Sequence, residues 1–451
     1  MTKQIAPEPQ SRNISESGFD RRLGYFDATM VVMGGMIGAG IFLNPSFVAQ
    51  SLQSSLLVII AWSIGGVIAF IGALIFAELG AFMPQVGGQY VYLSKGIHPL
   101  VGFLNGWGLF WIIATGAIAF VSVMSADYLA VLLGLPAVWV KPMAMTIVWG
   151  LSIVNYIGVR WGSLVQNFFM LLKLAALGCL IGFAFFLPTS PQPTFQVSTS
   201  QFAFHPSFLV LMGTALVPIL FSYGGWQNCN NIAEEVKNPH KILPVSIITG
   251  TVAVIVIYIL VNLAYLRVLG IHGLANTTTP AAETMKRILG GTGEKLISLS
   301  IVLSTLGISN LIILASPRVF FPAVRDHGLA RFAGRLHPVY RTPSFLIIAQ
   351  AAWSTLLIIL GTYRQLLSYV VFADWLFFAL TAITLFVFRR RFPDHPRPFK
   401  VWGYPFLPAL FVLFAIFIVI NTFFTQTRES AIGLLLLLSG VPIFYLKRKS
   451  E

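Results

Sequence analysis

The sequence predicts an all-α protein that crosses a membrane about twelve times. Of its 451 residues, 57% are hydrophobic and only 10% are charged, and the mean hydropathy is +0.82. A water-soluble domain of this composition would expose large apolar surfaces and aggregate. The apolar residues instead form separate runs of roughly 20 residues, the length at which an α-helix crosses the hydrocarbon core. Two further runs, GGMIGAGIF at 34–42 and FSYGGWQNCNN at 221–231, are interrupted by glycines.

The run at 34–42 marks the first span. It follows a polar stretch, 1–22, that has no apolar segment, so we expect a retained helix rather than a signal peptide. Glycine inside a helix costs about 1 kcal/mol relative to alanine, and several close together predict a broken helix. A break within a membrane leaves backbone N–H and C=O groups unpaired. Hydrocarbon tolerates such groups only where they line a cavity or bind a ligand.

The remaining spans follow in chain order. The second broken run, at 221–231, is the sixth of them, and its position suggests two corresponding halves with a polar ligand between them. Proline-containing segments at 84–88, 188–193 and 393–398 are typical of loops. The uninterrupted apolar runs are 56–77, 102–125, 143–154, 163–187, 243–265, 296–315, 345–360, 366–388, 406–424 and 432–446.

Charge predicts the orientation of these spans. With the N-terminus inside, 21 of the 29 Lys and Arg residues fall on the inner side, seven fall outside, and Lys173 lies within a span. Cytoplasmic loops carry such an excess, so we expect a cell-membrane protein with both termini in the cytoplasm. The net charge of +14 therefore reflects topology. No basic cluster is interleaved with aromatics in a polar domain, which argues against nucleic-acid binding.

Side chains that carry catalytic or metal chemistry are sparse. Cys179 and Cys229 both lie in apolar segments, and five of the seven histidines neighbour proline near span ends or in loops. No His and Asp cluster lies inside the membrane to form a metal or catalytic site. We therefore expect neither an enzyme nor a bound metal or cofactor.

Five motifs in a fixed order carry a family resemblance. They are GGMIGAGIF; AELGAFMPQVGGQYVYL at 77–93; a lysine in the fifth span; FSYGGW followed by NIAEEVKNP at 231–239; and STLGISN leading to SPRVFFPAVRDHGL within 304–329. Together they resemble the amino acid–polyamine–organocation superfamily, and within it the L-amino acid transporter family of bacterial type. The resemblance covers roughly residues 22 to 445.

The resemblance implies a LeuT-type fold: five helices, an inverted repeat of five more, and two peripheral helices. It divides the chain into a cytoplasmic tail at 1–22, a first repeat at 23–187, a second repeat at 208–391, two peripheral helices at 404–446 and a second tail at 447–451, with the transporter domain running from 23 to 446. The substrate site is then expected at mid-membrane, between the first and sixth spans.

An amino acid presents a carboxylate and an ammonium close together, so its site needs a positive and a negative helix end side by side. The N–H groups of Ala39, Gly40 and Ile41 are expected to take the carboxylate. The family often has serine where this chain has Ala39, so a hydroxyl is lost there while the amide remains. Backbone carbonyls of both breaks would take the ammonium. The expected substrate site comprises Met36, Ile37, Gly38, Ala39, Gly40, Ile41, Phe221, Ser222, Tyr223, Gly224 and Asn310.

Several of these residues have a second interpretation. Phe221 is a gate over the substrate by resemblance, but in so aromatic a chain it and Tyr223 are also consistent with ordinary packing. Asn310, together with Asn228, Asn230, Asn231 and Ser309, either lines the cavity or bonds helix to helix. Glu78, Asp127 and Asp374 are candidates for ion coupling. Glu78 and Asp374 are placed toward span ends, where a structural pair or a helix cap is the more common role.

Lys173 is the single basic residue placed inside a span. A charged lysine there costs about 3 kcal/mol or more at the membrane centre, so it needs a carboxylate, carbonyls or water as a partner. By resemblance it replaces the sodium ion of sodium-coupled relatives and donates to carbonyls near Gly34 and Gly35. The alternative is a lysine that titrates and carries a proton.

The expected function is therefore sodium-independent transport of L-amino acids, as an exchanger of neutral ones that works by alternating access. The alternative is a proton-coupled symporter with Lys173 as the titrating group. Animal members of the family bond to a glycoprotein through a cysteine after the third span, but the loop at 133–142 has none. We therefore expect a monomer without a disulfide-linked subunit, whose partners are the lipid bilayer and a small amino acid.

Overall fold

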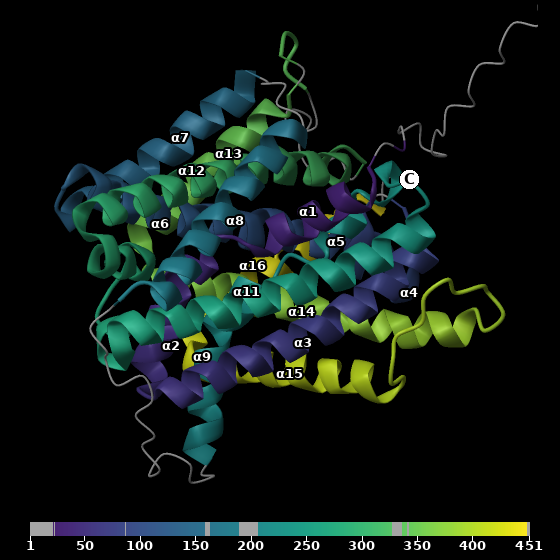
Figure 1. Ribbon diagram of the computed structural model, residues 1–451. Coiled ribbons are helices and arrows are strands. Elements are labelled where there is room, and N and C mark those ends of the chain that lie inside the picture. Colours follow the sequence, from purple (N-terminus) through teal and green to yellow (C-terminus); the bar gives the residue numbers. More distant parts are fainter. Residues whose placement is uncertain are drawn as a thin grey trace, which may run out of the picture.

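The computed structural model describes residue 21 and residues 23–85, 87–157, 163–188, 206–326, 336–340 and 342–448. Within these ranges every regular element is a helix, and one isolated parallel bridge joins Leu23 to Val236. Figure 1 shows a single bundle with α7 and α13 on one side, α15 on the other, and α1, α8 and α11 between them. The tail at 1–20 and residues 189–193 of the predicted loop lie outside the described residues.

The α-helices are, in chain order, α1 (Tyr25–Met36), α2 (Gly40–Leu52), α3 (Ser55–Phe82), α4 (Gly88–Gly96), α5 (Pro99–Gly108), α6 (Thr115–Leu133), α7 (Val140–Ile157), α8 (Ser163–Phe186), α9 (Pro206–Tyr223), α10 (Asn228–Asn231), α11 (Pro239–Ala275), α12 (Pro280–Asp326), α13 (Ser344–Leu360), α14 (Tyr363–Arg391), α15 (Phe406–Thr425), α16 (Thr427–Leu438) and α17 (Gly440–Arg448). A π-helical segment, η1 (Leu109–Ala114), joins α5 to α6.

The described chain holds nine helices or joined helices that are long and apolar enough to cross a membrane. Three shorter apolar helices, Met170–Phe186, Phe208–Tyr223 and Ser344–Leu360, fall at the fifth, sixth and ninth predicted spans. The all-α polytopic prediction is confirmed, and the order of spans matches the LeuT-type arrangement. Most helices extend beyond their apolar runs because polar residues continue the hydrogen-bonded ladder at the membrane surface.

Two sets of contacts define the ends of the bundle. At the N-terminal end, Leu23 N–H donates to Glu235 O at 2.9 Å, and Arg391 donates to Lys95 O at 3.2 Å. At the opposite end, Gln50 donates to Ala275 O at 2.8 Å. Successive spans therefore run in alternate directions between these two ends.

Glu78 is fully buried near the end of α3, on the side of the bundle that holds the N-terminus. Its carboxylate accepts hydrogen bonds from Arg389 at 2.9 and 2.6 Å, from Arg397 at 3.4 Å and from the Val401 N–H at 2.7 Å. This cluster ties α3 to the end of α14 and to the segment that follows it. Of the two interpretations of Glu78, the structure supports the structural pair.

The placement of Asp374 toward a span end is wrong. It lies eleven residues beyond Tyr363, where α14 begins, and seventeen before Arg391, where α14 ends. At 1.5 Å per residue it is roughly 16 Å from the nearer helix end. The apolar run at 366–388 begins three residues after α14 does. The sequence pattern therefore understates how far Asp374 lies from the end of the helix.

Candidate functional site at the two helix breaks

The structure places both helix breaks where the glycine motifs predict them. The first span is unwound at 37–39, between α1 and α2. The sixth span is unwound at 224–227, between α9 and α10. In both places, glycines fall where the backbone leaves the helix.

The two breaks touch each other. A Cβ at Gly35 would lie 2.8 Å from Gly225 O, and one at Gly40 would lie 2.8 Å from the Cα of Ser222. Gly225 also has a φ of 121°, a left-handed conformation that side chains strongly disfavour. Glycine at these positions therefore lets the two backbones meet. The residues predicted from two distant segments do lie together.

The positive side of the site is the start of α2. The N–H groups of Ala39, Gly40 and Ile41 have no hydrogen-bond acceptor in the described part of the chain, and all three residues are buried. Buried N–H groups almost always have a partner, so three consecutive unpaired donors need a ligand. They stand at the positive end of the α2 dipole, where an anionic group is stabilised.

The negative side consists of the carbonyl ends of α1 and α9, and it is already partly bonded. The Tyr258 hydroxyl lies 2.7 Å from Met36 O and 3.2 Å from Ser222 O, and Phe221 O accepts from Gly224 N at 3.2 Å. Each carbonyl retains a second lone pair for a ligand. Tyr258 is fully buried on α11 and joins the two breaks, a role that its place in an apolar run did not reveal.

Lys173 on α8 meets the first break. It is only 5% exposed, and its Nζ donates to Ile37 O at 3.1 Å. The contact is two residues beyond Gly35, because the chain first leaves the helix at Ile37. Within the described part of the chain this carbonyl is its one hydrogen-bond partner.

Phe221 is half-buried one residue before Ser222, and its ring meets Phe120 edge-on with the centroids 4.9 Å apart. It also packs against a cluster on α14 that includes Tyr369 and Val370. Phe221 is three residues before Gly224, so it stands at the end of α9 beside the second break. This position fits a gate as well as packing.

Asn310 does not face the breaks. Its Oδ1 accepts a hydrogen bond at 2.7 Å from Asn155 on α7, so it bonds one helix to another. The α12 residue beside the first break is Ile308, whose Cδ1 lies 3.9 Å from the position of a Cβ at Gly38. Side chains two positions apart on a helix point to nearly opposite faces. Because Ile308 faces the first break, Asn310 faces away from it. The inclusion of Asn310 in the site is therefore not supported.

Asn44, one turn into α2, is a further residue that the sequence did not single out. Its Nδ2 donates to Pro218 O and to Ser222 Oγ, both at 2.8 Å. It is fully buried and ties α2 to α9 beside the breaks. The signal was present, since a buried amide four residues after Gly40 must find partners.

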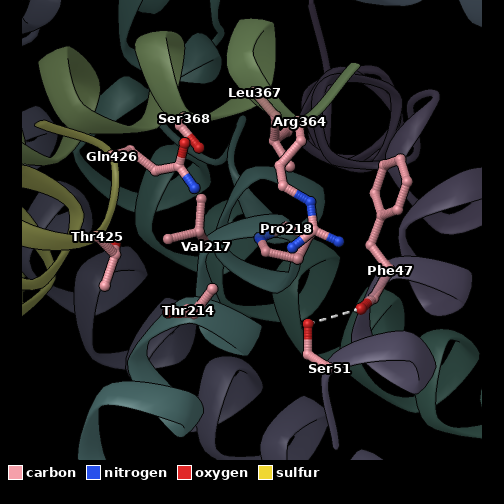
Figure 2. Close-up of a pocket in the computed structure, with 10 residues that line it drawn as sticks. All are labelled: Phe47, Ser51, Thr214, Val217, Pro218, Arg364, Leu367, Ser368, Thr425 and Gln426. Carbon is pink, nitrogen blue, oxygen red and sulfur yellow. Dashed lines mark hydrogen bonds between the residues drawn. The ribbon is translucent and has the colours of Figure 1, made fainter. Parts of the chain in front are cut away.

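A pocket lies nearer the opposite end of the bundle, away from the breaks (Figure 2). The Arg364 guanidinium stands 5.7 Å from the centre of the Phe47 ring on one side of it. Pro218 also lines this pocket and links it to the Asn44 contact. The pocket is lined by Phe47, Ser51, Thr214, Val217, Pro218, Arg364, Leu367, Ser368, Thr425 and Gln426. No group of three His, Cys, Asp or Glu side chains among the described residues is placed to hold a metal.

Comparison with known proteins identifies the family of this chain. A family model described as amino acid permease matches residues 23–443. The serine/threonine exchanger SteT of Bacillus subtilis (strain 168) is 31% identical over 445 residues, covering 97% of this chain and 99% of the relative. The human b(0,+)-type amino acid transporter 1 is 29% identical, covering 97% and 90%. The human cystine/glutamate transporter is 28% identical, covering 94% and 85%.

The match to the family model spans nearly all the described helices, including both breaks and Lys173. The family resemblance seen in the motifs is thus confirmed. The relatives are transporters, which agrees with the expectation that this protein is not an enzyme. The chain belongs to the amino acid permease family.

Proposed function

We propose that this protein exchanges L-amino acids, neutral ones among them, across the cell membrane without sodium, by alternating access. The observation that carries the proposal is the set of three unpaired N–H groups at Ala39, Gly40 and Ile41, beside the carbonyl ends of α1 and α9. A zwitterion is complementary to that arrangement. The relatives named as exchangers and transporters of amino acids support the same substrate class.

In the proposed binding mode, the substrate carboxylate accepts from the N–H groups at the start of α2. The ammonium donates to free lone pairs of the carbonyls at Met36, Phe221 and Gly224. Recognition through the backbone leaves the substrate side chain to the surrounding residues. Ile308 of α12 is one such residue, because its Cδ1 lies 3.9 Å from the position of a Cβ at Gly38 in the first break.

Lys173 supports the sodium-independent part of the proposal. Its ammonium lies against Ile37 O, where a cation stabilises the unwound carbonyl without an added ion. A fixed charge at this point would hold the first break in every step of the cycle. One observation favours the alternative of proton symport: within the described chain, Lys173 has a carbonyl but no carboxylate as its partner.

Topology and assembly are part of the same proposal. We place both termini in the cytoplasm, from the charge distribution, and the repeats at 23–187 and 208–391. We further propose a monomer without a disulfide-linked subunit, since Cys229 is buried and Cys179 lies within α8 rather than in a loop.

Reconstituted protein tests this function. Uptake of labelled amino acids into proteoliposomes should require an internal amino acid and should be unchanged when sodium is replaced by choline. Uptake into empty vesicles that depends on an inward proton gradient would instead support the symporter. Absence of amino acid uptake under all these conditions would contradict both.

A further inference from the structure

Asp374 is a carboxylate at mid-membrane depth that the exchange mechanism above does not use. It lies near the middle of α14 and is half-buried. Within the described chain it makes neither a hydrogen bond nor an ion pair. Carboxylates inside membrane spans are rare and almost always face the protein interior or a water-filled path, where they have a function.

The helix periodicity shows which way Asp374 faces. Residues 376, 380, 383 and 387 form the more exposed stripe of α14. At 3.6 residues per turn, Asp374 lies nearly opposite that stripe. Its neighbours one and two turns away are each at most 2% exposed: Leu367, Val370, Val371, Phe377, Phe378 and Thr381. The carboxylate therefore faces the interior of the bundle rather than lipid.

The part of the bundle interior that Asp374 faces is the second helix break, in the sixth span. Phe221 packs against the cluster that contains Val370 and Phe377, on one side of Asp374. The Trp226 ring lies 5.3 Å from that of Phe378, on the other side. Phe221 stands just before the unwound segment 224–227, and Trp226 lies within it. Asp374 is thus the acidic side chain on the face of α14 that meets this break.

Other polar groups here also have no partner. Two side-chain atoms here are buried without a hydrogen bond in the described chain. They are Trp226 Nε1, in the second break, and Thr381 Oγ1, two turns along α14 from Asp374. Buried polar groups are normally paired, so each of these two atoms leaves room for a polar partner such as water or a ligand. The carboxylate gives that place a negative charge.

The inverted repeat gives this position a counterpart. Lys173 stands near the middle of α8, the fifth span, and meets the break of the first span. Asp374 stands near the middle of α14, the tenth span, and faces the break of the sixth. Each repeat thus supplies one ionisable side chain to its own break, a cation in the first and an anion in the second. Within the described residues, Lys173 has a hydrogen-bond partner, whereas Asp374 has none.

We propose that Asp374 binds the charged end of a cationic amino acid side chain, such as that of lysine, and so extends the substrates from neutral to cationic amino acids. This inference rests on the proposed function. The backbone groups of the two breaks hold the α-carboxylate and α-ammonium. The side-chain ammonium then donates to Asp374, and pairing removes the cost of an isolated charge at this depth.

The test compares lysine with norleucine, which has the same side chain without the terminal ammonium. Purified full-length protein is reconstituted into proteoliposomes, which are loaded with one of the two amino acids. The kcat/KM of exchange is then measured for each labelled amino acid supplied outside. Asp374→Asn should lower the ratio of lysine to norleucine at least tenfold, whereas Asp374→Glu should keep it within about threefold of wild type. Glu283→Gln, which removes an equal charge from an exposed ion pair at 3.2 Å, is the control and should leave the ratio unchanged.

A second measurement needs no variant and covers the case in which Asp374→Asn does not fold. Unlabelled lysine should inhibit norleucine exchange by the wild type at least tenfold more strongly than neutral Nε-acetyllysine does. Three results would overturn the inference while leaving amino acid exchange intact. They are equal inhibition by lysine and Nε-acetyllysine, a wild type that exchanges norleucine but not lysine, and an unchanged lysine-to-norleucine ratio in Asp374→Asn. Proton uptake coupled to norleucine and lost in Asp374→Asn would assign this carboxylate to coupling instead. If no amino acid is exchanged, the proposed function itself fails.

Discussion

Single residues at the two breaks separate backbone roles from side-chain roles. Gly40 and Gly225 allow two helices to touch, whereas a Cβ at Gly38 would make only ordinary van der Waals contacts, although all three belong to glycine motifs. Lys173 and Tyr258 act through their polar ends, each on a carbonyl of the first break. The sequence predicted the glycines and the lysine because both are out of place in an apolar helix. It did not predict Tyr258, since a tyrosine in a membrane helix is unremarkable until its hydroxyl is located.

Gly40→Val should abolish exchange and also lower Tm. The physical reason is packing against α9, since a Cβ at this position meets the Ser222 Cα and Cβ at 2.8 Å, rather than direct crowding of the substrate. Gly150→Val on α7 is the matched control, because a Cβ there would have no neighbour within 4 Å and the residue lies outside the breaks. Thermal unfolding in detergent and exchange in proteoliposomes measure the two effects. A Gly40→Val protein with wild-type substrate binding would place the site elsewhere.

Lys173→Ala should reduce exchange at least tenfold under every ion condition. A hydrogen bond from a charged group contributes about 1.5–3 kcal/mol, and its loss frees the Ile37 carbonyl. Lys173→Met keeps the length of the side chain without its charge, and it should be impaired to the same extent. Uptake assays with sodium, choline and proton gradients provide the measurement. Wild-type transport that requires sodium would refute the fixed-cation role.

Phe221→Ala should slow turnover more than it weakens binding if the ring is a gate. Phe120→Ala removes the other half of the same edge-on contact, so the double variant should be little worse than either single one. Exchange rates and KM for all four proteins complete the cycle. Unchanged turnover in Phe221→Ala would assign the ring to packing.

At the level of elements, hydropathy predicted each helix, but not how it is rotated about its axis. Asn310 is polar enough to line a cavity or to bond one helix to another, and its side chain accepts from Asn155 on α7. The depth of Asp374 was misjudged for a different reason, since the apolar run begins three residues after α14 does. Rotation is decided by contacts between helices far apart in the chain, which a linear pattern does not contain. The start of α2 was predictable because the glycines fix it locally.

The clamp between α3 and α14 yields a prediction about stability. Glu78→Gln would leave Arg389 and Arg397 without their carboxylate, and breaking a buried ion pair costs about 3–5 kcal/mol. We expect a clear fall in Tm in detergent. The exposed pair of Arg287 and Glu283 is the control, since Glu283→Gln should change stability by about 1 kcal/mol or less. Equal Tm values for the two variants would show that Glu78 does not hold these elements together.

For the whole molecule, the balance of charge at the two ends predicts its orientation in the membrane. Hydrogen bonds between distant segments place residues 23, 95 and 391 at the N-terminal end and residues 50 and 275 at the opposite end. The arginine run at 389–391 belongs to the N-terminal end, which we therefore expect in the cytoplasm. An even number of spans then returns the C-terminus to that side.

Labelling of single cysteines tests this orientation. In a variant without Cys179 and Cys229, cysteines at residue 10 and at the C-terminus should react with an impermeant maleimide only after the cells are opened, whereas one near Gln192 should react in intact cells. Trp402 and Trp139 supply a matched pair of labelling sites among the described residues, because they are similarly exposed, at 56% and 52%. Trp402→Cys should be labelled only from inside, because it follows the arginine run, and Trp139→Cys only from outside. A C-terminus labelled in intact cells would require an odd number of spans, and with it a different arrangement of the second repeat around the sixth-span break.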